Sequence, residues 1–523
     1  MKKQSKLLCM LCSIAILCSC AACGSKTPVS STQDVSSVDV ASVSDVEETS
    51  NVPSDETSFV GTSSDAGTQS STTSSKKTGT SSTAAWGERD QTNNSTTYPK
   101  VIDMKGATLV LGVKNEKDYG GGKLGESEEG DKWIAWRKNF EKTYNCKLKN
   151  VAVSNYTLYD SLATKLMSGE KVADVITMQL FDVEAFRHAG LLQSLQSIPN
   201  LNLNHSAIVQ DMVNNFTFNG KSYLYFAANN VFEVYGLYFN KDMIKELKLT
   251  DPYALVKQKK WTWSAFSEMC EAAYKDNGNN KIDNADRFGS YIGADLPIGA
   301  LRVSGIQVIS YNNGKFNYAF NNSKTLSYLT QIKNTINNGK MVMSTKNITN
   351  TRAEAKFVKK ELLFCVQDSH ILENKDHQFW DIDFNYGFLP VPTFEEGMSY
   401  SNTCATWLGG LCVPKNTKQN LYIGYLLNSI SDMKASLAET DKKTQLRYFG
   451  GDKETYEIYK SYDRVFKQDL YCWQTQFKDL YKLQLEETLY DTGVTAKTII
   501  EKIDTPMKNA VKDYYAKDPD LMD

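Results

Sequence analysis

The chain has little of what metal centres and common catalytic sites require. It holds only four histidines in 523 residues, at positions 188, 205, 370 and 377, and their spacing does not suit a metal site. It contains no GxSxG, HExxH or GxxxxGK[ST] motif. A secreted carbohydrate-active enzyme with two carboxylates far apart in the chain stays an alternative, because no local motif marks such a pair.

An excess of positive charge is also missing. The net charge is −2, and it is divided unevenly along the chain. Residues 26–99 carry four Lys/Arg against ten Asp/Glu, whereas residues 100–523 are close to neutral. No basic surface for nucleic acid is therefore expected. A length of 523 residues exceeds what one hydrophobic core supports, so two or more domains are expected.

Long hydrophobic runs are absent except at the start. Three lysines precede the apolar stretch LLCMLCSIAILCSCAA, which is shorter than the roughly 20 residues that span a bilayer. Residues 1–22 resemble a bacterial lipoprotein signal peptide, cut before a cysteine that carries lipid. Cys23 is the expected acceptor because Ala22 precedes it and Gly24 follows, and Cys20 is the alternative. Lipid would then tether the protein to the outer face of the cytoplasmic membrane without a spanning helix.

Residues 23–99 are predicted to be an unfolded linker. Between Ser31 and Ala85, 26 of 55 residues are Ser or Thr, with scattered acids. Such a segment cannot bury enough apolar surface to offset the entropy of ordering. It is typical of a flexible stalk.

Six cysteines follow Cys23, and none of them has CxxC or zinc-type spacing. Most stand in apolar stretches such as LFCV and GLCV, which favours buried thiols. A bridge between Cys404 and Cys412 is the alternative.

From residue 100 onward the pattern alternates between strand and helix. Apolar strands are predicted at 107–113, 146–153 and 173–179, with amphipathic helices between and after them. This alternation predicts an α/β fold with a parallel sheet, in which ligands bind beyond the carboxyl ends of the strands. The residues after the first and third strands, 114–122 and 179–182, are therefore candidate binding loops.

The pattern changes at GLYFNKDMIKEL, residues 236–247. A long aromatic stretch, 222–240, gives way to segments that are mainly helical. Thr262 is the expected N-cap of a helix that begins in WTWSAF. We interpret the change as a crossing from one lobe to another.

Several segments together resemble the extracellular solute-binding proteins of ATP-driven importers, family 1, the sugar-binding type. The segments are ADVITM…FRHAGLLQSL, GLYFNKDMIKEL, DPYALVKQKKWTWSAF, YGFLPVPTFEEG and LGGLCVPKNTKQN, in the family's order. The resemblance implies a periplasmic-binding-protein-like type II fold, with two α/β lobes joined by a strand hinge. Lobe 1 would take residues 100–232 and 388–435, and lobe 2 would take 233–387 and 436–523.

The resemblance also implies a function without catalysis. The protein would bind a carbohydrate between its lobes as a monomer, close on it, and deliver it to the permease subunits of an ABC transporter. No cofactor would be required. A sensory or adhesive lipoprotein of the same fold is a further alternative.

Candidate ligand-binding residues lie at strand ends or beside the hinge, where aromatic rings can stack on sugars and polar groups can take hydroxyls. Each has a plainer alternative, such as core packing, a helix cap or a solvated loop. They are Glu233, Tyr235, Asn230, Phe181, Asp182, Lys117, Asp118, Tyr119, Gln367, Asp368, Trp407, Trp380 and Trp473.

One stretch, 276–289, has oxygen-bearing side chains at alternate positions, as in a calcium loop. Asn277, Asn279, Asp283 and Asp286 would be the ligands. Lys275 stands where the first acid is needed, so the alternative is an Asn/Gly-rich turn. A structural calcium ion is therefore expected only in this loop.

Overall fold

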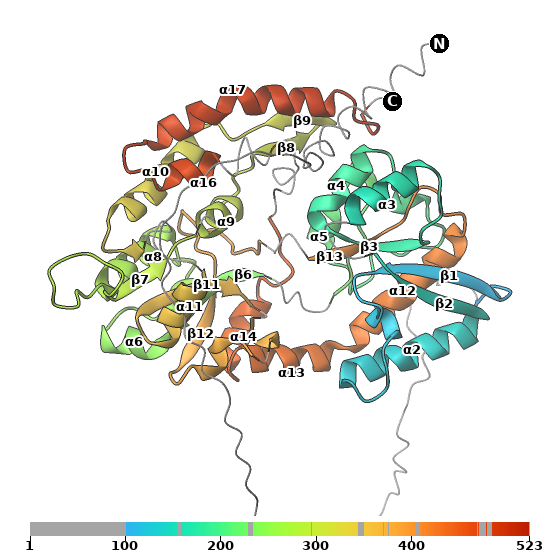
Figure 1. The fold of residues 1–523 in the computed structure, drawn as a ribbon, viewed down its shortest axis with the longest axis horizontal. Coiled ribbons are helices and arrows are strands. Elements are labelled where there is room, and N and C mark those ends of the chain that lie inside the picture. Colours follow the sequence, from blue (N-terminus) through green and yellow to red (C-terminus); the bar gives the residue numbers. More distant parts are fainter. Residues whose placement is uncertain are drawn as a thin grey trace, which may run out of the picture. The chain divides into compact units, whose positions relative to one another are not determined.

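The computed structural model describes residues 101–153, 158–228, 234–293, 295–343, 350–369, 371–374, 376–403, 408–467, 469, 477 and 484–521. These residues form two β-sheets with helices around each, together with two short hairpins (Figure 1).

The first sheet has four strands in the order β13-β3-β1-β2. Strand β1 pairs in parallel with β2 and β3, while β13 is an antiparallel edge strand beside β3. The carboxyl ends of β1 and β3 therefore meet at one edge of the sheet, as the sequence predicts. The strands are β1 (Ala107–Val113), β2 (Cys146–Ala152), β3 (Val175–Gln179) and β13 (Gly409–Cys412).

Helices cover both faces of this sheet. Apolar side chains of α2 and α12 pack with β1 in one core cluster, whereas α3 and α4 contribute to another. We call this sheet and its helices the first lobe. Its other elements are α2 (Glu128–Tyr144), α3 (Leu158–Met167), α4 (Leu180–His188), α5 (Gln210–Asn214), α12 (Asn420–Ser436), η1 (Asp118–Gly120), η2 (Leu195–Ser197) and the hairpin β4 (Thr217–Phe218) and β5 (Lys221–Ser222).

The second sheet has five strands in the order β10-β7-β11-β6-β12. It is mixed, because β7 pairs in parallel with β10 and β11, whereas β6 is antiparallel to β11 and β12. The strands are β6 (Tyr235–Asn240), β7 (Phe288–Tyr291), β10 (Val342–Met343), β11 (Leu362–Asp368) and β12 (Tyr386–Pro390).

The second lobe is this sheet with the helices that pack on it. Thr262 caps α8 by accepting the Ala265 N–H, as predicted. Helix α17, red in Figure 1, packs against the hairpin of β8 and β9. The elements are α6 (Lys241–Glu246), α7 (Pro252–Lys257), α8 (Trp263–Ala273), α9 (Asp295–Val303), β8 (Ile309–Asn312), β9 (Lys315–Tyr318), α10 (Ser323–Asn337), α11 (Asn350–Val358), η4 (Ile371–Glu373), η5 (Gln378–Asp381), α13 (Ala438–Tyr448), α14 (Lys453–Lys460), α16 (Gln484–Leu489) and α17 (Ala496–Tyr515).

The chain passes between the two sheets more than once. It leaves the first sheet after Tyr225, which pairs with Leu411, and enters the second at Tyr235. It returns after Pro390, because all of β12 pairs with β6. The expected return at residue 388 is therefore too early, because residues 388–390 still pair with β6 of the second lobe. The sequence could not show this, since apolar residues continue through FLPV and do not mark where the strand pairing ends.

The apolar core does not divide as neatly as the sheets do. The α3–α4 side of the first lobe and the interior of the second lobe belong to one contiguous cluster of buried side chains. Phe218 of β4 contacts Tyr311 and Phe316 of the other hairpin, with ring centroids 5.5 Å apart in both pairs. The two lobes are therefore packed together away from the crossing segments as well.

Candidate functional site

The loop after β1 has an unusual backbone. Tyr119 lies in the left-handed region, with φ 48° and ψ 40°, and Gly120 follows with φ 78°. A bulky residue rarely adopts this conformation, and such strain is found most often at functional sites. The loop therefore needs strong local support.

Neighbouring elements supply that support. The Asn150 amide donates hydrogen bonds to the carbonyls of Glu116 (2.9 Å) and Asp118 (2.6 Å). A Cβ on Gly121 would lie 1.9 Å from the Glu116 carbonyl oxygen, so only glycine fits there. The Tyr119 ring meets the Trp133 ring of α2 edge-on, with centroids 5.4 Å apart. The loop is held rigidly against β2 and α2.

The predicted residues of this loop have different environments. Lys117 is exposed and pairs with Glu126 at 3.1 Å. The Asp118 carboxylate accepts the Asn115 N–H, yet burial raises its pKa above the usual value. Burial and the nearby Asp118 charge raise the pKa of Tyr119 to about 12, so its phenol stays protonated at neutral pH.

Phe181 and Asp182 stand in the first turn of α4, directly after β3. The start of this helix is hydrogen-bonded to the residue before β13, since the Leu180 N–H donates to the Leu408 carbonyl at 3.0 Å. Burial raises the pKa of Asp182 to about 7. Among the described residues no group donates a hydrogen bond to its carboxylate, so a half-buried acceptor stands at the sheet edge without a protein partner.

We expect Asp182→Asn to stabilise the protein at pH 8 by on the order of 1–2 kcal/mol, because the neutral amide avoids the cost of burying a charge. The folded state binds a proton more tightly than the unfolded chain, whose carboxyl has the ordinary pKa of 3.8. The wild type therefore loses stability as the pH rises from about 4 to about 7, and the variant does not. Chemical denaturation at several pH values measures this difference. The exposed Asp376→Asn is the control, and an equal pH profile for Asp182→Asn and wild type would contradict the assignment.

Tyr235 lies where the crossing segments meet. Its N–H donates to the Thr403 carbonyl (3.1 Å), and Asp368 of β11 is its partner in the strand pair. The Ser369 N–H donates to the Val234 carbonyl (2.9 Å). Tyr235 and Asp368 are therefore brought together beside the crossing, and their predicted roles in ligand binding stay predictions.

The other two predicted residues of the second lobe are engaged within it. The Gln367 amide donates to the Glu354 carboxylate, which also contacts His377 (3.2 Å) and the Gln378 amide (2.9 Å). Trp380 is 45% exposed on η5, and its indole N–H donates to the Asn374 carbonyl. Glu233, Asn230, Trp407 and Trp473 lie outside the described residues, so their predicted roles stay predictions.

The family of bacterial extracellular solute-binding proteins matches residues 125–420, more than half of the chain. The chain belongs to this family. A search of curated proteins found no match.

Solved structures show the same fold at low sequence identity. A sugar transporter from Rhizobium etli in an open conformation is 14% identical, with 77% of this chain and 99% of that chain covered and a TM-score of 0.54. UspC from M. tuberculosis is 12% identical, with 77% and 100% covered and a TM-score of 0.54. The maltose-binding protein MalE from Listeria monocytogenes, in complex with maltose, is 16% identical, with 78% and 98% covered and a TM-score of 0.52. The two-lobed, type II fold predicted from the sequence is confirmed.

Some contacts of this solute-binding protein were not predicted from its sequence. Arg464 donates to the carbonyls of Ala228, Ser206 (3.0 Å) and Ile208 (2.6 Å), and so joins the segment after α14 to the first lobe. Asn150 braces the loop at Tyr119. Neither Arg464 nor Asn150 stands in a motif, and the partners of Arg464 lie more than 230 positions away in the chain. No local signal could therefore have identified these two residues.

The predicted calcium ligands hydrogen-bond within their own loop. The Asp286 carboxylate accepts from Tyr274 and from the N–H groups of Asn277 and Asp283. The amides of Asn277 and Asn279 donate to Asp283. The described residues contain no group of three or more His, Cys, Asp or Glu side chains that could hold a metal ion. Calcium binding stays a prediction.

Four of the cysteines that follow Cys23 lie within the described residues, and they are buried as the sequence predicts. Cys146, Cys270, Cys365 and Cys412 are buried and free, so Cys412 makes no bridge. Burial raises the pKa of Cys146 to about 11, which keeps its thiol protonated. Within the described part of the chain, every helix is too short or too polar to cross a membrane.

Proposed function

We propose that this protein binds an extracellular carbohydrate between its lobes and delivers it to an ABC permease. The family match over residues 125–420 carries the proposal, because that family consists of extracellular binding proteins and not of enzymes. The structural relatives include a sugar transporter and a maltose complex, which supports sugars as the first solutes to test. The N-terminal cysteine, Cys23 or Cys20, would hold the protein at the membrane through lipid.

The arrangement of the strand ends supports this proposal chemically. Asp118, Tyr119, Phe181 and Asp182 follow two adjacent strands of one sheet, and Tyr235 stands beside the crossing segment. A half-buried carboxylate that has no hydrogen-bond donor among the described residues, such as Asp182, can accept the hydroxyl of a neutral sugar. Aromatic rings beside it can cover the apolar face of the sugar ring.

We expect a neutral oligosaccharide to raise the melting temperature in a screen that includes malto-oligosaccharides. A ligand at 100 times its Kd stabilises the folded state by about 2.7 kcal/mol. Glu233→Ala and Trp407→Ala are each expected to weaken binding about tenfold or more in calorimetry, without loss of the cooperative melting transition. The exposed Glu396→Ala is the control. Binding like wild type in both variants would contradict the proposed site, whereas no response to any sugar would contradict the solute class.

A further inference from the structure

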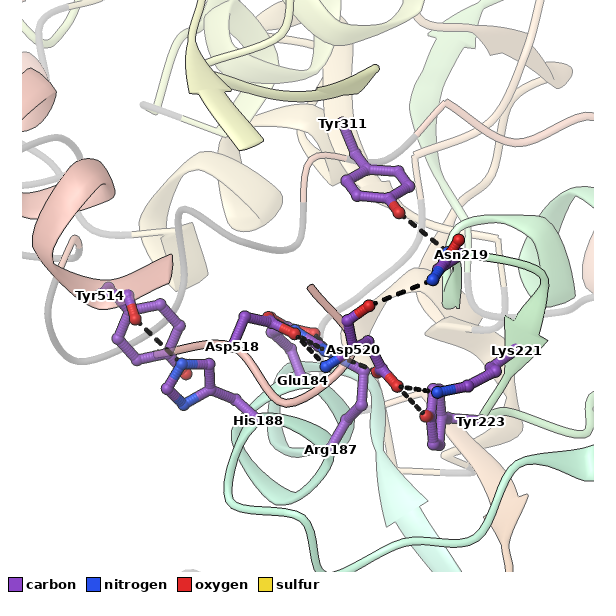
Figure 2. A network of polar contacts seen from close by, with 10 residues as sticks. All are labelled: Glu184, Arg187, His188, Asn219, Lys221, Tyr223, Tyr311, Tyr514, Asp518 and Asp520. Carbon is purple, nitrogen blue, oxygen red and sulfur yellow. Dashed lines mark hydrogen bonds and ion pairs between the residues drawn. The ribbon is translucent and has the colours of Figure 1, made fainter. Parts of the chain in front are cut away.

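The C-terminal segment contacts the first lobe, although the helix that precedes it belongs to the second. Helix α17 ends at Tyr515 and packs against β9 and α10. Asp518 and Asp520 then lie against α4 and the β4–β5 hairpin (Figure 2). These contacts are separate from the crossing segments at Tyr235 and Thr403.

Arg187 of α4 is the centre of this contact. Its guanidinium donates two hydrogen bonds to Glu184, at 2.6 and 2.7 Å, which orient it from within the same helix. It also donates to both carboxylate oxygens of Asp518 and, at 2.9 Å, to Asp520. All three guanidinium nitrogens thereby donate to carboxylates, in the fork geometry that arginine favours.

Further groups of the first lobe bind the same tail. The Tyr223 hydroxyl donates to Asp520 at 2.7 Å, and the Lys221 ammonium lies 3.3 Å from the same carboxylate. The Asn219 amide donates to the Asp520 carbonyl, and its backbone N–H donates to the Tyr311 hydroxyl of β8 at 2.8 Å. The tail is thus held by side chains from both α4 and the hairpin.

Burial makes these contacts strong. Arg187 is 1% exposed, and Glu184 and Asp518 are not exposed at all. Burial alone would raise the pKa of Asp518, but the hydrogen bonds and charge of Arg187 outweigh it and hold the pKa below its usual value. Removing one partner while the others stay buried would leave an uncompensated charge in the interior, which costs about 3–5 kcal/mol.

Aromatic packing surrounds the ionic centre. The His188 ring stacks on Tyr514 with centroids 3.9 Å apart, and its Nε2 lies 3.0 Å from the Tyr514 carbonyl. Tyr515 stacks on Phe316 at 3.7 Å, while the Arg187 guanidinium lies over the Phe218 ring at 4.3 Å. The contact therefore excludes water from the charges and adds apolar area of its own.

We propose that residues 514–521 form a clasp that holds the second lobe to the first in the absence of solute. Opening of the lobes then requires release of Asp518 and Asp520 from Arg187. Helix α4 carries Asp182 in its first turn and Arg187 near its end, so the clasp holds the same helix that contributes to the candidate site. The fraction of molecules whose lobes are closed then depends on this tail as well as on any ligand.

The clasp is tested by an inter-lobe distance in the ligand-free full-length chain. Spin labels are attached through Lys138→Cys on α2 and Asn509→Cys on α17, both exposed positions. The chain without further substitutions is expected to show one narrow distribution of distances between the two labels in double electron–electron resonance. Asp518→Asn combined with Asp520→Asn is expected to broaden it and to add longer distances, and so is deletion of residues 518–523.

Asp513→Asn is the control, because Asp513 is exposed on α17 and the substitution removes one negative charge directly before the clasp. Tyr223→Phe removes one hydrogen bond and is expected to give a smaller shift in the same direction, which keeps the test valid if the double variant folds poorly. A distribution that stays narrow in the deletion and in the double variant would overturn the clasp. So would a distribution that is already broad without either change. Neither outcome depends on which solute binds.

Discussion

Arg187→Met is expected to lower the free energy of unfolding by about 3–5 kcal/mol, the cost of leaving buried carboxylates without their counter-ion. Methionine replaces much of the volume of the arginine stem, so packing on Phe218 is largely kept and the loss is mainly electrostatic. Glu184, Asp518 and Asp520 would then face one another, with the Lys221 ammonium as a remaining cation beside Asp520. Denaturant unfolding of both proteins measures the difference.

Lys517→Met is the matched control for this substitution. Lys517 is exposed in the same tail, and its removal takes away the same charge, so a change within about 0.5 kcal/mol is expected. Equal losses from the two substitutions would show that the buried ionic centre does not stabilise the fold.

Gly121→Ala is expected to cost about 2–3 kcal/mol of stability and to weaken solute binding at least tenfold. The new Cβ would lie 1.9 Å from the Glu116 carbonyl oxygen and 2.6 Å from the Asn150 amide nitrogen. The loop would have to move, and the orientation of Asp118 and Tyr119 would change with it. Unfolding experiments and solute titration report the two effects separately.

Gly122→Ala provides the comparison in the same loop. A Cβ there would approach only the movable end of Glu126, at 3.2 Å, and the carbons of Lys117. Its effect on stability is expected to be below about 1 kcal/mol. If Gly121→Ala behaves like Gly122→Ala, the rigid loop is not part of the binding surface.

Local sequence signals predicted much of the first lobe. The sequence predicts the strand 107–113 and the helix around Trp133, because the spacing of apolar residues within one element shows which of its faces is buried. Thr262 was predicted as a cap for a similar reason, since a cap depends on residues only three positions away. The short strands β8, β9 and β10 were not predicted, because two to four residues carry too little periodicity.

The candidate site could be predicted only in part. Asp118, Tyr119 and Asp182 follow from the rule that parallel strands present their carboxyl ends together. The left-handed backbone at Tyr119 could not be foreseen, since it depends on Asn150 and Trp133 from other elements. The clasp joins residues 331 positions apart and depends on burial that no sequence window reports.

The central proposal is that this two-lobed solute-binding protein binds a neutral oligosaccharide without altering it. An equilibrium titration followed by tryptophan fluorescence, with the sugar recovered afterwards for product analysis, tests it most directly. We predict saturable binding with one site per chain and complete recovery of unchanged sugar. The claim would be contradicted if no sugar in the panel gave saturable binding, or if reducing ends were released during the titration.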